Sequence, residues 1–286
     1  MGALGDHLAV VVYPGIAELT QFWEIQATEG EAQAEQVLEI PQVQLAFVSR
    51  QLLDAPARKR IKDLDLKFRG PQAWPEFRSY RPGYTPYDID GDEAELLEAA
   101  LKQVIEIAPR FQKESLMDPD RPDRYLVRTP GGEEYREIPP PTGPGIELQL
   151  TGEEIGRWRA LPISRSAMEL DFFLMMTPIA EGKDRPFFPY LLLGVDGISG
   201  LVVLQDMLSV DDSVMHMLGE IPNRLVQQCI GLGARPAKVF ARAGRLDRVL
   251  EVVAKPLEFQ VEPRAALPQL DPAKESFFEF LRRGPR

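Results

Sequence analysis

The chain has little of the chemistry that metal and thiol sites require: its 286 residues include one cysteine and two histidines, His7 and His216. A structural zinc site or a Cys–His nucleophile needs more ligands than these supply, so neither is expected. Cys229 lies in the apolar helical pattern LVQQCIGLG, which indicates a buried structural thiol. A lone buried thiol is typical of proteins from a reducing compartment, and we predict a cytoplasmic protein.

Long apolar runs are also missing. No stretch reaches the roughly 20 residues that a membrane helix needs, and the start, MGALGDHLAVVVYPG, lacks the features of a signal peptide. The motifs G-x-x-x-x-G-K-[ST] and G-x-S-x-G do not occur, so the sequence gives no support for nucleotide hydrolysis or a serine hydrolase. No membrane association is expected.

Positive charge is scarce in the first half of the chain. The net charge is −11, and residues 1–150 hold 16 Lys and Arg against 26 Asp and Glu. Such a balance repels phosphate backbones, so nucleic acid is not an expected partner.

Composition and periodicity predict two α/β domains with mixed sheets, joined by a linker. Residues 1–112 are expected to form a smaller N-terminal α/β domain, with strands at 7–13 and 43–49 and helices at 14–25, 54–64 and 90–111. Residues 113–163 are rich in proline and glycine and are expected to be a linker that contains one hairpin. Residues 164–286 are expected to form the second domain.

The second domain has a legible element order. Strands are expected at 167–176, 189–196 and 201–208, the last two joined by a tight turn at 197–200. A helix at 214–233, with a break or kink at Pro222, a strand at 238–243, a helix at 244–255, a strand at 257–262 and a helix at 271–283 follow. The pattern is three antiparallel strands followed by alternating helices and strands.

This order and several motifs resemble the ribonuclease-H-like fold of integrases and transposases. The motifs are ELDFF with Asp171, PYLLLGVDGISG, ARAG at 241–244, and PAKESFF with Glu275. The resemblance covers residues 167–283 and implies a ribonuclease-H-like domain with catalytic candidates Asp171 and Glu275.

The chemistry of that family needs three carboxylates around two divalent metal ions. Where the resemblance places the second aspartate, this sequence has Arg242, then Ala243 and Gly244. A guanidinium repels a metal ion, so the resemblance implies a degenerate active site with no metal or other cofactor.

Two alternatives stay open for these carboxylates. One is a divalent-metal-dependent nuclease that uses Mg or Mn, with Asp171, Glu275 and a replacement carboxylate such as Asp196 or Asp247. The other is structural: Asp171 facing solvent in a strand, Asp196 bonding its own turn, and Glu275 as a helix-surface charge.

A second resemblance spans most of the chain outside the linker. MGALGDHLAVVVYPG, LDLKFRGPQAWPEFRSYRPGYTPY and RPFFPYLLLGVDGISGLVV are similar to a two-domain bacterial family of unknown function. Members of that family usually have further sequence before MGALG, so two explanations are open: a strand or helix of the first domain is missing here, or the start codon is misassigned.

The stretch FRGPQAWPEFRSYRPGYTPY, residues 68–87, concentrates six aromatic rings, three arginines and four prolines. We interpret it as a stiff loop, and two roles are open. It either closes the core with aromatic side chains or presents a recognition surface for an acidic protein segment or a small anionic ligand. The binding candidates are Arg69, Trp74, Phe77, Arg78, Tyr80, Arg81 and Tyr84.

Taken together, the sequence predicts a non-catalytic cytoplasmic protein for binding or assembly, with a degenerate integrase-like domain. Its expected partner is an unidentified protein or a small anionic ligand. Self-association through an exposed sheet edge is a further possibility.

Overall fold

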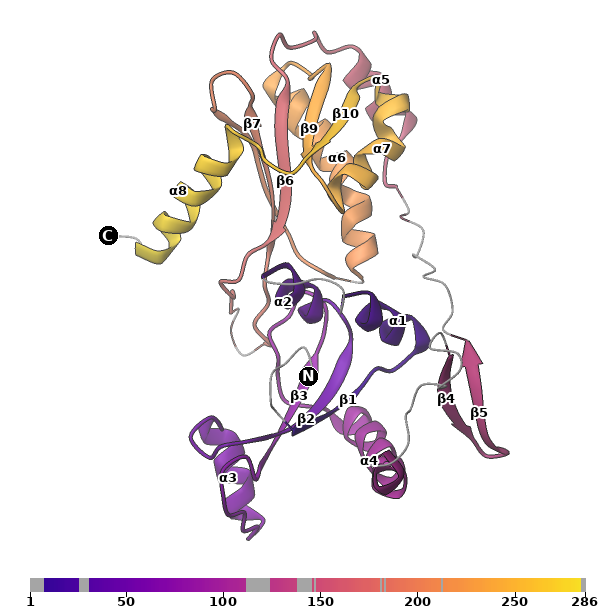
Figure 1. Ribbon diagram of the computed structural model, residues 1–286. Coiled ribbons are helices and arrows are strands. Elements are labelled where there is room, and N and C mark those ends of the chain that lie inside the picture. The colour runs from indigo at the N-terminus through magenta and orange to yellow at the C-terminus, as the bar shows by residue number, and fades with distance from the viewer. Residues whose placement is uncertain are drawn as a thin grey trace. The chain divides into compact units, whose positions relative to one another are not determined.

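The computed structural model (Figure 1) describes residues 8–25, 31–111, 124–137, 146, 148–180, 182, 184–211 and 213–283. His7 and the MGALGD start lie outside these residues. The chain divides into two compact units, Met1–Gly143 and Pro144–Arg286. The described part of the predicted linker, 113–163, contains a hairpin and a helix, and the domain boundaries at 112 and 163 stay predictions.

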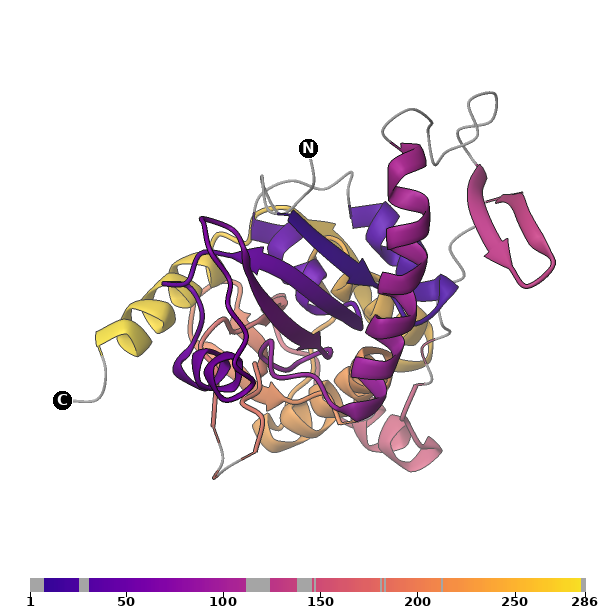
Figure 2. The ribbon, with the colours of Figure 1, turned by 90° about the horizontal axis from the view of Figure 1, so that it is seen from below.

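The N-terminal unit is built on an antiparallel sheet of β1 (Leu8–Val12), β2 (Gln42–Val48) and β3 (Trp74–Tyr80), in that order. Along β2, alternation sends Val43 and Leu45 to one face. The helix α4 (Gly91–Phe111) packs there on β1 and β2, with Leu97 buried in the same cluster. Figure 2 shows this long purple helix beside the sheet.

The opposite face of β2 is packed by α3 (Ala55–Asp63), whose Ile61 joins Ala46 and Val48 in a second cluster. Asp54 caps α3, because its Oδ1 accepts a 2.7 Å hydrogen bond from the Ala57 amide. The unit also contains α1 (Ile16–Ile25), α2 (Glu31–Leu38) and the antiparallel hairpin of β4 (Arg124–Thr129) and β5 (Gly132–Glu137).

The prediction of a loop over residues 68–87 is wrong for its centre, because residues 74–80 form β3. Three of the four prolines flank the strand, and the fourth, Pro75, lies on the edge strand of the sheet. An edge strand tolerates proline, since the missing amide need not pair with a further strand. The aromatic Trp74, Phe77 and Tyr80 are side chains that strands favour, and the strand is only partly buried.

The C-terminal unit has a five-stranded mixed sheet with the order β10-β9-β6-β7-β8. The strands β6 (Met168–Leu174), β7 (Tyr190–Asp196) and β8 (Val202–Leu208) pair antiparallel, as predicted. On the other side of β6, β9 (Lys238–Arg242) and β10 (Gln260–Arg264) run parallel to it. The strand β6 is therefore central, and helices must carry the chain back between the parallel strands.

Helices cover the two faces of this sheet unequally (Figure 1). Of the helices in the described ranges, α8 (Leu270–Arg283) alone lies on one face, where its Phe277 and Phe278 pack on a cluster that includes Phe173 and Leu191. The other side holds α5 (Gly152–Arg159), α6 (Val214–Leu232) and α7 (Leu246–Leu257). These three helices pack on one another, and the buried Trp158 of α5 donates a 2.6 Å hydrogen bond to the Leu257 carbonyl.

Two sequence predictions in this unit need correction. Of the predicted break or kink at Pro222, the break is wrong, because α6 is a single helix with buried residues such as Ile221 and Leu225 on both sides of the proline, and the kink stays a prediction. Packing of both halves outweighs the lost amide. The helix α7 extends through Pro256 to Leu257, and β10 begins three residues later than predicted, because Glu258 adopts a left-handed C-cap conformation that composition does not signal.

Among the helices in the described ranges, none combines the length and apolar character needed to span a bilayer.

The buried position of Cys229 on α6 confirms the prediction of a structural thiol, and burial raises the pKa of this thiol to about 12. We therefore expect the native protein to react with a thiol reagent such as DTNB at least about a hundredfold more slowly than the protein in urea, because reaction needs an exposed thiolate. Absorbance at 412 nm follows both reactions. A fast native reaction at one thiol per chain would contradict this burial.

Candidate functional site

Asp171, the first catalytic candidate, lies on the central strand β6 and points to the face covered by α8. Alternation along ELDFF places it on the same face as Glu169 and Phe173. Its side chain is 3% exposed, and its Oδ1 accepts a 2.8 Å hydrogen bond from the Phe172 amide. A carboxylate this buried needs a cationic or hydrogen-bonding partner.

Two cations supply that partner. The Nε of Arg242 lies 3.3 Å and the Nζ of Lys274 lies 3.1 Å from the same oxygen, Oδ2 of Asp171. The parallel pairing of Leu170 with Ala241 explains the first contact, because it sets the next residues of the two strands side by side. Lys274 arrives from α8, where its ammonium also lies 3.6 Å from the centre of the Phe173 ring.

Arg242 connects three parts of the unit. Besides Asp171 on β6, its guanidinium donates to the Ala265 carbonyl and forms an ion pair with Asp271 on α8. Burial lowers the pKa of Arg242, but the Asp271 hydrogen bond and the Asp171 charge outweigh it, so the pKa rises above its usual value. The pKa of Asp271 is lowered although burial raises it, because the Leu267 amide and Arg242 favour the charged form.

Glu275, the second catalytic candidate, is exposed on α8. In the described part of the chain, no hydrogen bond or ion pair joins it to Asp171, and the preceding residue Lys274 takes that place. Adjacent helical residues point about 100° apart, so only one of the two can face the sheet.

The two replacement carboxylates considered from the sequence are occupied by local hydrogen bonds. Oδ1 of Asp196 accepts from the amides of Ile198 and Ser199 at 3.1 and 2.7 Å, and Oδ1 of Asp247 accepts from the Gly244 amide at 3.0 Å. Within the described ranges, no group of three or more His, Cys, Asp or Glu side chains is arranged to hold a metal ion.

A buried carboxylate also anchors the start of α8. Glu169 is 3% exposed, and its Oε2 accepts hydrogen bonds from the amides of Gln269 and Leu270 at 2.8 and 2.9 Å. These amides belong to the free N-terminal groups of the helix, so β6 fixes α8 at its first turn. The sequence reading missed both Glu169 and Lys274. Glu169 lies two positions before Asp171 in the predicted strand, so the two side chains share a face. This spacing is the signal that could have identified Glu169.

In the N-terminal unit, the arginines of residues 68–87 bind carboxylates of their own unit. Arg78 contacts Glu76 and Asp54 at 2.8 and 3.2 Å, and Arg81 contacts Asp90 and Glu93 at 2.6 and 3.2 Å. Arg69 is exposed, and no ion pair of this residue is seen among the described residues.

The aromatic residues of the same segment divide between the two faces of the sheet. Trp74 packs on the α3 cluster beside Phe68, with the Arg50 guanidinium 5.6 Å from its ring centre. Tyr80 and Tyr84 are partly buried, and burial raises the pKa of Tyr80. These contacts favour the core-closing role over the recognition role for most of the segment.

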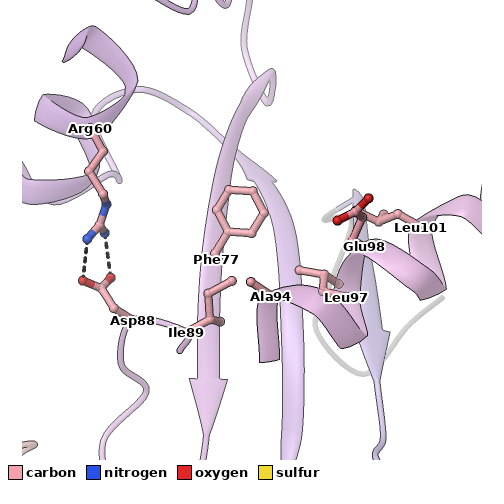
Figure 3. A pocket seen from close by; sticks show the side chains of 8 residues that line it. All are labelled: Arg60, Phe77, Asp88, Ile89, Ala94, Leu97, Glu98 and Leu101. Atoms are coloured by element: carbon pink, nitrogen blue, oxygen red, sulfur yellow. Dashed lines mark hydrogen bonds and ion pairs between the residues drawn. The ribbon is translucent and has the colours of Figure 1, made fainter. Parts of the chain in front are cut away.

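Phe77 is the exception, because it is 40% exposed and lines a cavity of about 410 Å³ on the α4 side of the sheet (Figure 3). The other lining residues come from α4, the segment before it and α3: Ile89, Ala94, Leu97, Leu101, Arg60, Asp88 and Glu98. Of the binding candidates predicted from the sequence, only Phe77 lines this cavity. The sequence predicted the helix at 90–111 but not the role of its Leu97 and Leu101 as a wall of this cavity.

Comparisons with known proteins agree with a two-domain organisation. Residues 1–128 match the family described as a domain of unknown function, DUF7309, and residues 154–278 match a second domain of unknown function, DUF6930. Together the matches fit an uncharacterised two-domain family. No curated protein matches the chain.

The Asp171 network makes a prediction about stability. Replacing Arg242 by alanine leaves a buried carboxylate with one cation fewer, and we expect this to lower the free energy of unfolding by about 1–3 kcal/mol. Urea denaturation followed by circular dichroism measures the change. Arg165→Ala, at an exposed arginine of the same unit, is the matched control and should change it by less than about 0.5 kcal/mol.

A double-mutant cycle separates the pair from the individual side chains. If the two residues interact, Asp171→Ala combined with Arg242→Ala costs less than the sum of the single variants. Additive costs would contradict the interaction.

Asp196 makes a prediction about pH. Its pKa is lowered from 3.8 to about 2, first by the Ser199 amide and then by serine hydroxyls. A depressed pKa in the folded state means that the carboxylate stabilises the fold above pH 4 and loses this effect as the pH falls toward 2. We therefore expect the difference in urea midpoint between wild type and Asp196→Asn to shrink steadily between pH 5 and pH 2.5. A difference that stays constant over this range would contradict the assignment.

Proposed function

We propose that this protein is a non-catalytic cytoplasmic protein for binding or assembly, and that its C-terminal unit is a degenerate ribonuclease-H-like domain. Numbering the five strands of that unit in chain order gives the spatial order 5-4-1-2-3, with only the second strand antiparallel to the other four. The strand order and directions support the assignment, as do the motifs around Asp171 and Glu275.

One observation carries the loss of catalysis: two cations, Arg242 and Lys274, bind the Asp171 carboxylate. In an integrase-like site that oxygen would coordinate a divalent metal ion. A metal ion there would face two positive charges, and each pair of unit charges 4 Å apart costs about 4 kcal/mol at an effective dielectric of 20. The network therefore takes over the stabilising role of a metal and joins β6, β9 and α8 directly.

The proposal also covers the location of the protein and the class of its partner. A cytoplasmic location is part of this proposal, because the single buried thiol of Cys229 suits a reducing compartment. The partner is a protein or a small molecule rather than nucleic acid, given the net charge of −11.

Calorimetric titration with Mn²⁺ tests the loss of the metal site. We expect no saturable binding to the wild-type protein. The double variant Arg242→Asp, Lys274→Ala removes both cations and adds a carboxylate beside Asp171 and Asp271, so it should gain saturable binding. Arg242→Asp with Lys255→Ala, which removes an exposed lysine elsewhere, is the matched control and should bind more weakly.

Metal binding by the wild-type protein would have the opposite meaning. Saturable Mn²⁺ binding by the wild type that disappears in both Asp171→Ala and Glu275→Ala would overturn the proposal. Such a result would favour the metal-dependent nuclease.

A further inference from the structure

The cavity on the N-terminal unit is lined by apolar side chains that no other described part of the unit covers. The helix α4 packs chiefly on β1 and β2, while Phe77 lies on the edge strand β3 and stays 40% exposed. Leu97 and Leu101, one helical turn apart on α4, also line the cavity, and Ile89 and Ala94 complete its apolar lining (Figure 3). A volume of about 410 Å³ is within the range of small-molecule sites.

Two of the three charged residues that line the cavity neutralise each other. Arg60 donates two hydrogen bonds of 2.7 Å to the two oxygens of Asp88, an arrangement that Figure 3 shows at one side of the cavity. The hydrogen bond from Arg60 lowers the pKa of Asp88, and this effect is larger than the opposing effect of burial. Both groups are therefore charged at neutral pH. Their pair has no net charge and its guanidinium is already occupied by a carboxylate.

Among the described residues that line the cavity, an anionic ligand finds no uncommitted cation, because Arg60 is paired with Asp88. Arg78 on β3 and Arg81, the residue after β3, are ion-paired with carboxylates as well. This weakens the sequence-based expectation of an anionic ligand.

Glu98 supplies the remaining charge of the lining. Its only ion pair among the described residues is with Lys102, one turn further along α4, and both side chains are 67% exposed. Exposed pairs of this kind are worth little, so Glu98 can accept a second cation with little loss.

We propose that this cavity binds a small organic cation, with an apolar or aromatic body against Phe77, Leu97 and Leu101 and an ammonium group beside Glu98. The proposal deepens the binding role proposed above, but it is independent of the Asp171 network, which belongs to the other unit.

Three probes with one apolar body and different charges test the ligand class: 2-phenylethylammonium, 2-phenylethanol and 3-phenylpropionate. Each is titrated into the full-length ¹⁵N-labelled protein, and amide shifts are followed by NMR. We expect the ammonium to bind about threefold more tightly than the alcohol and about tenfold more tightly than the carboxylate, with the largest shifts at residues 76–78 and 94–101.

Substitutions test the charged and the apolar part of the site separately. Glu98→Gln keeps the shape of the side chain but removes its charge, so the ammonium and the alcohol should then bind within about twofold of each other. Glu95→Gln, an exposed glutamate of α4 outside the cavity lining, is the matched control and should leave the preference unchanged. Ala94→Trp fills the cavity from an exposed position and should abolish binding of all three probes.

The outcomes also separate this proposal from the preceding one. Equal or tighter binding of the carboxylate, the same effect from Glu95→Gln as from Glu98→Gln, or shifts confined to other residues would each overturn the cavity site. None of them changes the Mn²⁺ titration, which reports on the C-terminal unit alone.

Discussion

The C-terminal unit depends on the ion pairs of a single guanidinium. Arg242 reaches Asp171 on the central strand and Asp271 at the start of α8, and it also holds the Ala265 carbonyl of the connection between β10 and α8. Without these contacts, Asp171 would be a 3% exposed carboxylate with Lys274 as its only cation. Asp171 on the central strand, Arg242 on the parallel edge of the sheet and the helix α8 are therefore held by one electrostatic network.

Glu169, on the same strand as Asp171, adds a second set of contacts to α8. It binds the first amides of α8, while Asp171 binds Lys274 one turn later in the helix. Two carboxylates on one strand, with one residue between them, thus fix both the position and the rotation of α8. Apolar contacts of Phe277 and Phe278 alone would allow the helix to slide, because dispersion forces are not directional.

The sequence predicted the long, strongly periodic elements well, and the order of strands and helices from β6 to α8 follows from apolar periodicity and turn residues. It failed where tertiary contacts decide. Prolines suggested a loop where β3 pairs with β2, and Pro222 suggested a break in a helix that is packed on both sides of it. For the candidate site, Arg242 at the position of the expected aspartate directly indicated the loss of a metal site. The contact of Lys274 with Asp171 could not be predicted, because the direction of this side chain depends on how α8 is rotated about its axis.

The separation of these partners along the chain has a consequence for the order of folding. The hairpins of β6, β7 and β8 join neighbouring segments, but Arg242 is 71 residues and Lys274 is 103 residues from Asp171. Contacts between distant segments form late, because closing long loops costs entropy before the contact returns any energy. We expect the three-stranded meander to form first with the Asp171 carboxylate still hydrated, and the removal of that water to coincide with the arrival of β9 and α8.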